Sequence, residues 1–180
     1  KIRIYINLSE KKCYICILNI NNMQFEIVEF EDLSGPVAHI YSLMPQGSGR
    51  TLLEEFFDEN KVYSDELREI YEKIDTMAKY TGCRRDFFKH NEGAAGDGVA
   101  ALRVGHIRLY CLYYDRTAVI FGSGGYKPPH TRAYQETPAL NAKAELVKKI
   151  AKAFNKALID KDIKVEEDGS ISGLKLISYD

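Results

Sequence analysis

The stretch VAALRVGHIRLYCLYYDRTAVIFG, residues 99–122, decides the fold class. It contains three runs rich in β-branched and aromatic residues, at 99–104, 106–114 and 117–122, and such runs are typical of strands. Asp115-Arg116 separates the last two runs, and so short a connection indicates a tight hairpin. The stretch therefore predicts an antiparallel sheet.

Toward the N-terminus, the hydrophobic pattern predicts more strands. Residues 1–8 and 24–31 alternate apolar and polar side chains, and residues 12–20 form another strand-like run that ends at a turn, Asn21-Asn22. Residues 34–50 contain two prolines and three glycines and predict a connection without regular structure. This part of the chain is expected to be a β meander added to the sheet.

Helices are expected on both sides of the opening stretch. A short helix is predicted at 50–58, and a longer one begins with Ser64 as its cap and ends at Gly82. Pro138 opens a third helix that runs to about Leu158. The chain then predicts a hairpin at 163–179, around Asp168-Gly169.

These elements predict one α+β domain, residues 1–180. It would have an antiparallel sheet, two helices on the N-terminal side and one C-terminal helix. The chain of 180 residues is 45% hydrophobic and 28% charged, which is an ordinary globular composition. A chain of this length buries enough surface to fold without a disulfide or a metal.

Several classes of protein are disfavoured by the sequence. No apolar run approaches the roughly 18 residues needed to cross a bilayer, and no secretion signal is evident, so a cytoplasmic protein without a membrane partner is expected. The cysteines form one C-x-x-C pair and two singletons, at positions 13, 16, 83 and 111. A zinc site wants a second pair or suitably spaced histidines, so buried free thiols are expected, with no metal and no cofactor.

Charge is distributed unevenly along the chain, although its net value is only −1. Residues 103–164 hold twelve basic and five acidic residues, a net charge of +7, and the remainder of the chain therefore carries −8. Such an asymmetry indicates a basic face that meets a polyanion or an acidic partner. The alternative is that the lysines of the third helix are merely solvated.

The loop that follows the strands reads GSGGYKPPHTRAY, residues 122–134. It matches neither the P-loop nor the dinucleotide pattern, because no Lys-Ser/Thr pair and no immediate helix follow the glycines. Cleavage of RNA needs a base, a cation beside the phosphate and an acid. The loop offers these types at Lys127, His130, Arg132 and Tyr134, and Arg108 lies on a neighbouring strand. Taken singly, His130 also suits a turn and Tyr134 suits packing on the helix.

The order of motifs resembles that of the RelE/ParE-like toxin superfamily, and within it the HigB-like branch. The motifs are Leu102-Arg103, then Ile107-Arg108-Leu109-Tyr110, the hairpin, Tyr126-Lys127 and the helix after Pro138. The resemblance implies that Arg108 contacts the scissile phosphate and that Lys127 is a base or phosphate contact. It also implies that Arg132 and Tyr134 stand close to the terminal helix.

The chain departs from this family pattern in several ways. It is longer, with the extra N-terminal strands and the C-terminal hairpin, and Pro128-Pro129 is not typical. His130 has no fixed counterpart, so its catalytic role is inferred from chemistry alone. Arg103 and a patch of Arg84, Arg85 and Lys89 are predicted to extend the RNA-binding surface, although a simple surface loop explains that patch equally well.

Three functions follow as hypotheses. The first is a metal-independent, ribosome-dependent mRNA endonuclease, the toxin of a toxin–antitoxin pair, whose partners would be mRNA on the ribosome and a cognate antitoxin. The second is a non-catalytic binder on the same fold, such as a gyrase inhibitor. The third is an interaction module in which the basic helix docks a partner and the loop is inert.

Overall fold

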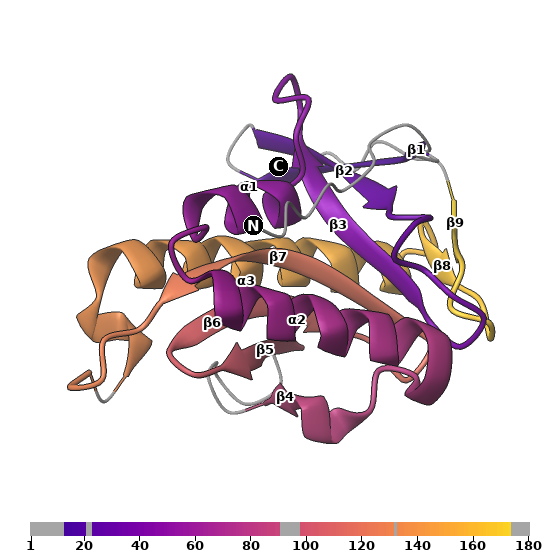
Figure 1. Ribbon diagram of the computed structural model, residues 1–180. Helices are drawn as coiled ribbons and strands as arrows, with labels where there is room; N and C mark the ends of the chain where they lie inside the picture. The colour runs from indigo at the N-terminus through magenta and orange to yellow at the C-terminus, as the bar shows by residue number, and fades with distance from the viewer. Residues whose placement is uncertain (1–12, 21–22, 91–97, 132, 174–180) are drawn as a thin grey trace.

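A seven-stranded sheet runs through the protein, with helices on both of its faces (Figure 1). The computed structural model describes residues 13–20, 23–90, 98–131 and 133–173. Within these residues the strand order is β1-β2-β3-β7-β6-β5-β4. The strands are β1 (Cys13–Ile20), β2 (Met23–Glu29), β3 (His39–Pro45), β4 (Phe88–Lys89), β5 (Val99–Val104), β6 (Ile107–Tyr113) and β7 (Ala118–Tyr126).

The expected hairpins at the centre of the sequence are confirmed. β5, β6 and β7 pair antiparallel in chain order, and Arg103 lies opposite Arg108 across the first pair. Side chains alternate between the faces of β6, as in any strand. Ile107 and Leu109 enter the core on one face, whereas Tyr110 and Leu112 enter the core on the other.

The expectation of a purely antiparallel sheet is wrong, because β3 and β7 run parallel. β3 was itself expected to be a connection, yet Ile40, Tyr41 and Leu43 are buried in this strand. Parallel neighbours need a long crossover between them, and the helices that follow β3 supply it. The hydrophobic pattern of a strand does not indicate which strand will lie beside it. The parallel pairing that makes the sheet mixed could therefore not be predicted from the sequence.

Two helices cover one face of the sheet. They are α1 (Leu52–Glu59) and α2 (Ser64–Thr76), and η1 (Met77–Thr81) extends the second. Thr51 caps α1 in a capping box with Glu54, whose carboxylate accepts the Thr51 N–H at 2.7 Å. Tyr63, not Ser64, is the N-cap residue of α2, so the predicted cap is wrong by one residue.

The opposite face carries α3 (Pro138–Ile159), which begins at the predicted proline. Its buried side, including Val147, Ile150 and Phe154, packs on the same core as β2, β3 and β6, and Lys149 and Lys152 are exposed. The predicted C-terminal hairpin is also confirmed, as β8 (Lys164–Val165) and β9 (Ile171–Ser172). The strand predicted at 1–8 and the turn at 21–22 lie outside the described residues.

Candidate nucleic-acid interface

One candidate site lies where β7 leaves the sheet beside the β5–β6 turn. Tyr126 pairs with Ile107, and the Lys127 N–H donates to the His106 carbonyl oxygen at 2.8 Å. The turn itself needs Gly105, whose φ is +51°. These contacts bring two parts of the chain together and fix where the loop starts.

Three aromatic rings gather at this point and form what we call the ring cluster, Tyr63, His106 and Tyr126. The two tyrosine rings are parallel, with centroids 4.8 Å apart, and the His106 ring meets Tyr126 edge-on at 5.7 Å. His106 is exposed and both tyrosines are half-buried. Aromatic rings at a protein surface are the platforms on which single-stranded nucleic acids stack their bases.

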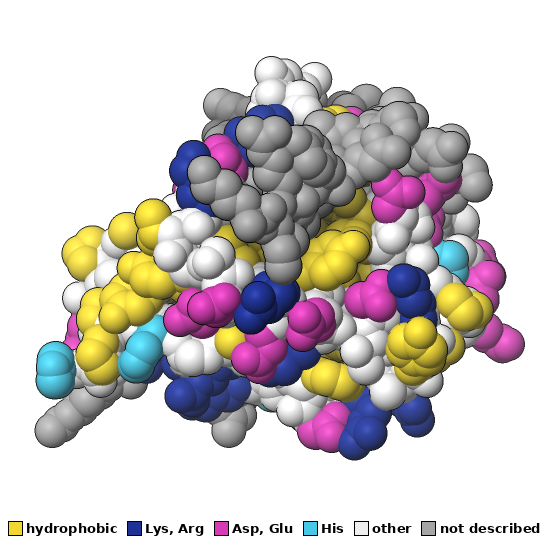
Figure 2. Space-filling model, viewed as in Figure 1, with side chains coloured by type: hydrophobic (Ala, Val, Ile, Leu, Met, Phe, Trp, Pro, Cys, Tyr) yellow, Lys and Arg dark blue, Asp and Glu magenta, His cyan; other side chains and the backbone are white. Residues whose placement is uncertain are grey.

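Basic residues lie near the ring cluster along the chain. Lys127 follows Tyr126 directly, and Arg103 is exposed on β5 beside the same turn. His130 is exposed in a turn closed by the Thr131 N–H, which donates to the Pro128 carbonyl oxygen at 3.1 Å. Figure 2 shows two histidines at this end of the molecule beside a band of hydrophobic side chains. Arg132, the remaining predicted cation of the loop, lies outside the described residues.

Arg108 lies inside this end of the sheet. This residue is only 3% exposed, and its Nη1 donates to the carbonyl oxygens of Gly105 and Ile107, each at 3.0 Å. The guanidinium group therefore ties down the β5–β6 turn. A contact between Arg108 and an RNA phosphate would require this side chain to leave the turn, and the predicted role stays a prediction.

Tyr134 lies in the core under α3, in a short 3₁₀ turn, η3 (Tyr134–Glu136). Its ring packs edge-on against Tyr110 at 5.8 Å, and its hydroxyl accepts a hydrogen bond from Lys148. Partial burial opposes the charge of Lys148, but hydrogen bonds to Tyr134 and Glu145 raise the pKa of Lys148 overall. In this conformation Tyr134 packs against the terminal helix, and its catalytic role also stays a prediction.

The predicted RNA-binding arginines fall into two groups. Arg103 lies on β5 opposite Arg108, close to the β5–β6 turn, whereas Arg84 and Arg85 lie at the other end of β6, beside Tyr113. Lys89 is on β4, the edge strand, and is exposed. Arg108 and Tyr113 are five positions apart on β6, which at about 3.4 Å per residue is about 17 Å. The predicted residues therefore do not form one continuous patch.

An acidic helix lies on the face of the sheet between these ends. α2 carries five acidic and two basic residues, and its apolar side packs on the core under β6. Asp65, Glu69 and Glu72 are exposed. Like charges repel along such a surface, so a phosphate backbone that crossed α2 would be disfavoured.

Two ring-cluster residues, Tyr63 and His106, were missed by sequence reasoning. Tyr63 precedes a helix cap and His106 sits in a turn, and neither position carries a local signal of function. Their meeting with Tyr126 joins parts of the chain more than sixty residues apart along the sequence. Only the crossover of α1 and α2 brings Tyr63 to the end of β7.

The described residues provide little basis for a metal site or a reactive thiol. No group of three His, Cys, Asp or Glu side chains is placed to hold a metal ion in that part of the chain. Burial and the nearby Asp115 raise the pKa of the Cys83 thiol to about 12, and burial raises the pKa of Cys111 well above its ordinary value. Both thiols are therefore protonated at neutral pH and inert as nucleophiles.

Comparison of the chain with family models, curated proteins and solved structures gave no match. Within the described part of the chain, no helix combines the length and the apolar character that crossing a membrane requires.

Proposed function

We propose that the protein is a RelE-like toxin that binds single-stranded mRNA on the ribosome at the ring cluster and cleaves it. The observation that carries the proposal is the stacked Tyr63–Tyr126 pair beside Lys127. Rings of this kind hold bases of any sequence, and an adjacent cation holds the phosphate. A protein antitoxin would neutralise it, and both would act in the cytoplasm.

The element order supports a RelE-like assignment. A helix pair, α1 and α2, precedes the antiparallel strands β5, β6 and β7, and a glycine-containing loop then leads to the terminal helix α3. This is the order that the motif resemblance implies. The strands β1 and β2 and the hairpin β8–β9 would be additions to that core.

The proposed chemistry uses the RNA's own 2′-hydroxyl and no metal. One imidazole, His130 or His106, takes the proton from the 2′-oxygen, which attacks phosphorus. The bond from phosphorus to the 5′-oxygen breaks, and that oxygen leaves with a proton from the second imidazole. The products are a 2′,3′-cyclic phosphate and a 5′-hydroxyl. Lys127 stabilises the negative charge that develops on the phosphate oxygens.

A second candidate, a non-catalytic binder on the same fold, is favoured by one observation. Arg108, the residue that the resemblance assigns to the scissile phosphate, is buried and hydrogen-bonded to its own turn. A binder needs the ring cluster and its cations but needs no exposed Arg108. The two candidates therefore share a binding surface and differ in cleavage.

The test measures binding and cleavage separately. Purified wild type, Tyr126→Leu, Lys127→Gln and the control Lys149→Gln are titrated with labelled single-stranded RNA. They are then incubated with mRNA, with and without translating ribosomes. We expect Tyr126→Leu to weaken binding about fivefold or more, because stacking on one ring contributes about 1–3 kcal/mol. Lys149 is exposed on α3, so its variant should match wild type.

The outcomes separate the hypotheses. Cleavage products with cyclic-phosphate ends, lost in Lys127→Gln, support the endonuclease. Binding without cleavage in any condition supports the second candidate. RNA binding that is equal in Tyr126→Leu, Lys127→Gln and Lys149→Gln, or no RNA binding at all, overturns the proposal and leaves an interaction module.

A further inference from the structure

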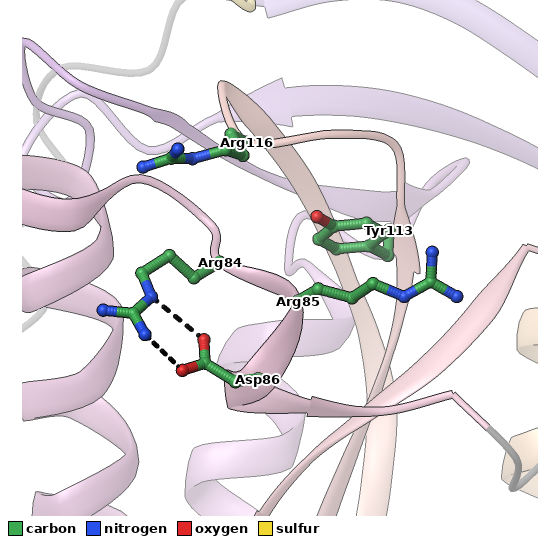
Figure 3. A pocket seen from close by; sticks show the side chains of 5 residues that line it. All are labelled: Arg84, Arg85, Asp86, Tyr113 and Arg116. Atoms are coloured by element: carbon green, nitrogen blue, oxygen red, sulfur yellow. Dashed lines mark hydrogen bonds and ion pairs between the residues drawn. The ribbon is translucent and has the colours of Figure 1, made fainter.

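A second site is formed at the far end of β6, in a hollow of about 590 Å³ that we call the arginine pocket (Figure 3). It opens where the chain after η1 meets the β6–β7 turn. Among the residues that the structure describes, it is lined by Arg84, Arg85, Asp86, Tyr113 and Arg116. A space of this size is in the range of small-molecule sites.

Backbone contacts fix the frame of the arginine pocket. The Cys83 N–H donates to the Arg116 carbonyl oxygen at 2.8 Å, and Arg116 Nη2 donates to the Thr81 carbonyl oxygen at 3.0 Å. Gly82 has φ +71°, and a Cβ there would lie 2.7 Å from the Arg116 carbonyl oxygen. The two segments that line the pocket are thus held against each other by hydrogen bonds to main-chain carbonyl oxygens and by the close approach of their backbones.

The charge of the arginine pocket favours an anion. Three arginines and one aspartate line it, which leaves a net charge of +2. The guanidinium of Arg84 forks onto Asp86, with Nε 3.1 Å from Oδ1, and so offsets the one acidic side chain among the described lining residues. Asp115, close by, is turned into its own turn, where its carboxylate accepts from the Thr117 N–H and hydroxyl.

The lining has two different sides. Figure 3 shows Arg84 and Arg116 on one side of the pocket, with the Tyr113 hydroxyl pointing toward them, whereas Arg85 extends in the other direction past the Tyr113 ring. Burial, together with the nearby Cys83 and Asp115 side chains, raises the pKa of Tyr113, so its hydroxyl is a donor at neutral pH. The Arg85 guanidinium makes no hydrogen bond or ion pair with any residue that the structure describes.

We propose that the arginine pocket binds a nucleoside monophosphate, either free or as the 5′ end of an RNA. The phosphate lies between Arg84 and Arg116 and accepts the Tyr113 hydroxyl, and the base stacks on the planar Arg85 guanidinium. A phosphate monoester carries a charge of about −1.5 to −2, which matches the pocket. An internal phosphodiester carries only a single charge and belongs to a continuous strand. A strand that ran from the arginine pocket to the ring cluster would have to cross the acidic side chains of α2.

This site is independent of the proposed function, because its lining shares no residue with the ring cluster. Binding is measured by calorimetry on the full chain with AMP, adenosine and ribose 5-phosphate. The variants are Arg116→Gln, Arg85→Gln and the control Arg68→Gln, an exposed α2 arginine that pairs only with acids of its own helix among the described residues. Tyr126→Leu is included so that failure at the ring cluster and failure here are distinguished.

AMP should bind more tightly than adenosine and than ribose 5-phosphate. Arg116→Gln should weaken AMP about tenfold or more, since hydrogen bonds to charged groups contribute that much, and should bring AMP close to adenosine. Arg85→Gln should instead bring AMP close to ribose 5-phosphate. Tyr113→Phe, which keeps the ring, should weaken the phosphate-containing ligands only. Arg68→Gln and Tyr126→Leu should bind AMP like wild type.

Two further ligands distinguish the sources of the phosphate. A 5′-phosphorylated tetranucleotide that binds more tightly than AMP identifies an RNA end, and equal affinities identify a free nucleotide. Equal affinity for AMP and adenosine in the wild type overturns the proposal. So does AMP binding that neither Arg85→Gln nor Arg116→Gln changes.

Discussion

The two ends of β6 present the same kinds of residue in opposite proportions. At the β5–β6 turn, the ring cluster offers rings first and cations second, with Tyr63 and Tyr126 stacked and Lys127 beside them. At the β6–β7 turn, the arginine pocket offers three guanidinium groups around a single ring, Tyr113. The first arrangement suits a row of bases, and the second suits one concentrated negative charge.

The ends also differ in how the backbone supports them. The ring cluster depends on a close approach of two strands, because a Cβ on Gly124 of β7 would lie 2.0 Å from the Arg108 carbonyl oxygen on β6. The arginine pocket depends on one glycine in a left-handed conformation, Gly82, docked on a turn. The position of a cationic residue in the sequence therefore does not predict a binding role until the backbone around it is known.

The largest expected effect comes from closing the strand approach. Gly124→Ala should lower the free energy of unfolding by about 3 kcal/mol or more, because the added methyl group meets main-chain atoms that have no room to shift. Gly125→Ala is the matched control, since its nearest neighbours would be 3.8 Å away, and it should stay within about 1 kcal/mol of wild type. Urea unfolding measures both.

Equal stability of the two variants would show that β6 and β7 separate easily at this end, and the ring cluster would lose its claim to a rigid frame. A Gly124→Ala chain that fails to accumulate in soluble form, beside a well-folded Gly125→Ala chain, would support the same conclusion as a measured loss of stability.

Local chemistry made much of the fold readable from the sequence. The hairpins β5–β6–β7 follow from alternation and short turns, and α3 begins at Pro138 as expected. β3 was missed because its flanking prolines and glycines resemble those of a loop, although its middle is buried on both faces. Pairing between β3 and β7 is a long-range contact, and no local pattern contains it.

Much less of the candidate site was readable. The sequence drew attention to the neighbourhood of Tyr126-Lys127, because cations and glycines gather there. It did not reveal that Arg108 is buried, since an arginine on an alternating strand looks solvent-facing. Hydrogen bonds to the carbonyl oxygens of Gly105 and Ile107 satisfy the guanidinium in its buried position. Tyr113 and Arg116 also escaped notice, because their meeting with Arg84 and Arg85 depends on tertiary structure.

An intermediate effect is expected on how the free energy of unfolding depends on pH. It concerns the arginine pocket, because a buried thiol lies directly behind it. The Cys83 pKa is about 12 in the folded state, against an ordinary value of 9.0. The folded chain therefore holds this proton more tightly than the unfolded chain. Its contribution to stability is complete below about pH 9 and is lost as the pH rises toward 12, at up to 1.4 kcal/mol per pH unit, roughly.

Cys83→Ala should make stability fall less steeply than in wild type between about pH 9 and about pH 11. Urea unfolding at several pH values measures the two slopes. Groups that do not interact with Cys83 titrate equally in both proteins and cancel in the difference. Parallel pH profiles for wild type and Cys83→Ala would mean that the Cys83 thiol ionises in the folded state and that the frame of the arginine pocket is open to solvent.

The smallest expected effect is on the salt dependence of RNA binding. This effect shows which end of β6 contacts the phosphate backbone of the RNA. Each phosphate that a cation neutralises on a single strand adds about 0.7 to the slope of log affinity against log salt. With a 5′-hydroxyl oligonucleotide, Lys127→Gln should therefore lower the slope by about 0.7 between about 50 and 200 mM KCl. Arg85→Gln should leave the slope unchanged, because this RNA brings no monoester to the arginine pocket.

Fluorescence anisotropy gives both slopes, with Lys149→Gln as the reference. If Arg85→Gln lowers the slope as much as Lys127→Gln does, one RNA strand spans both ends, the acids of α2 do not divide them, and the two sites are parts of a single track.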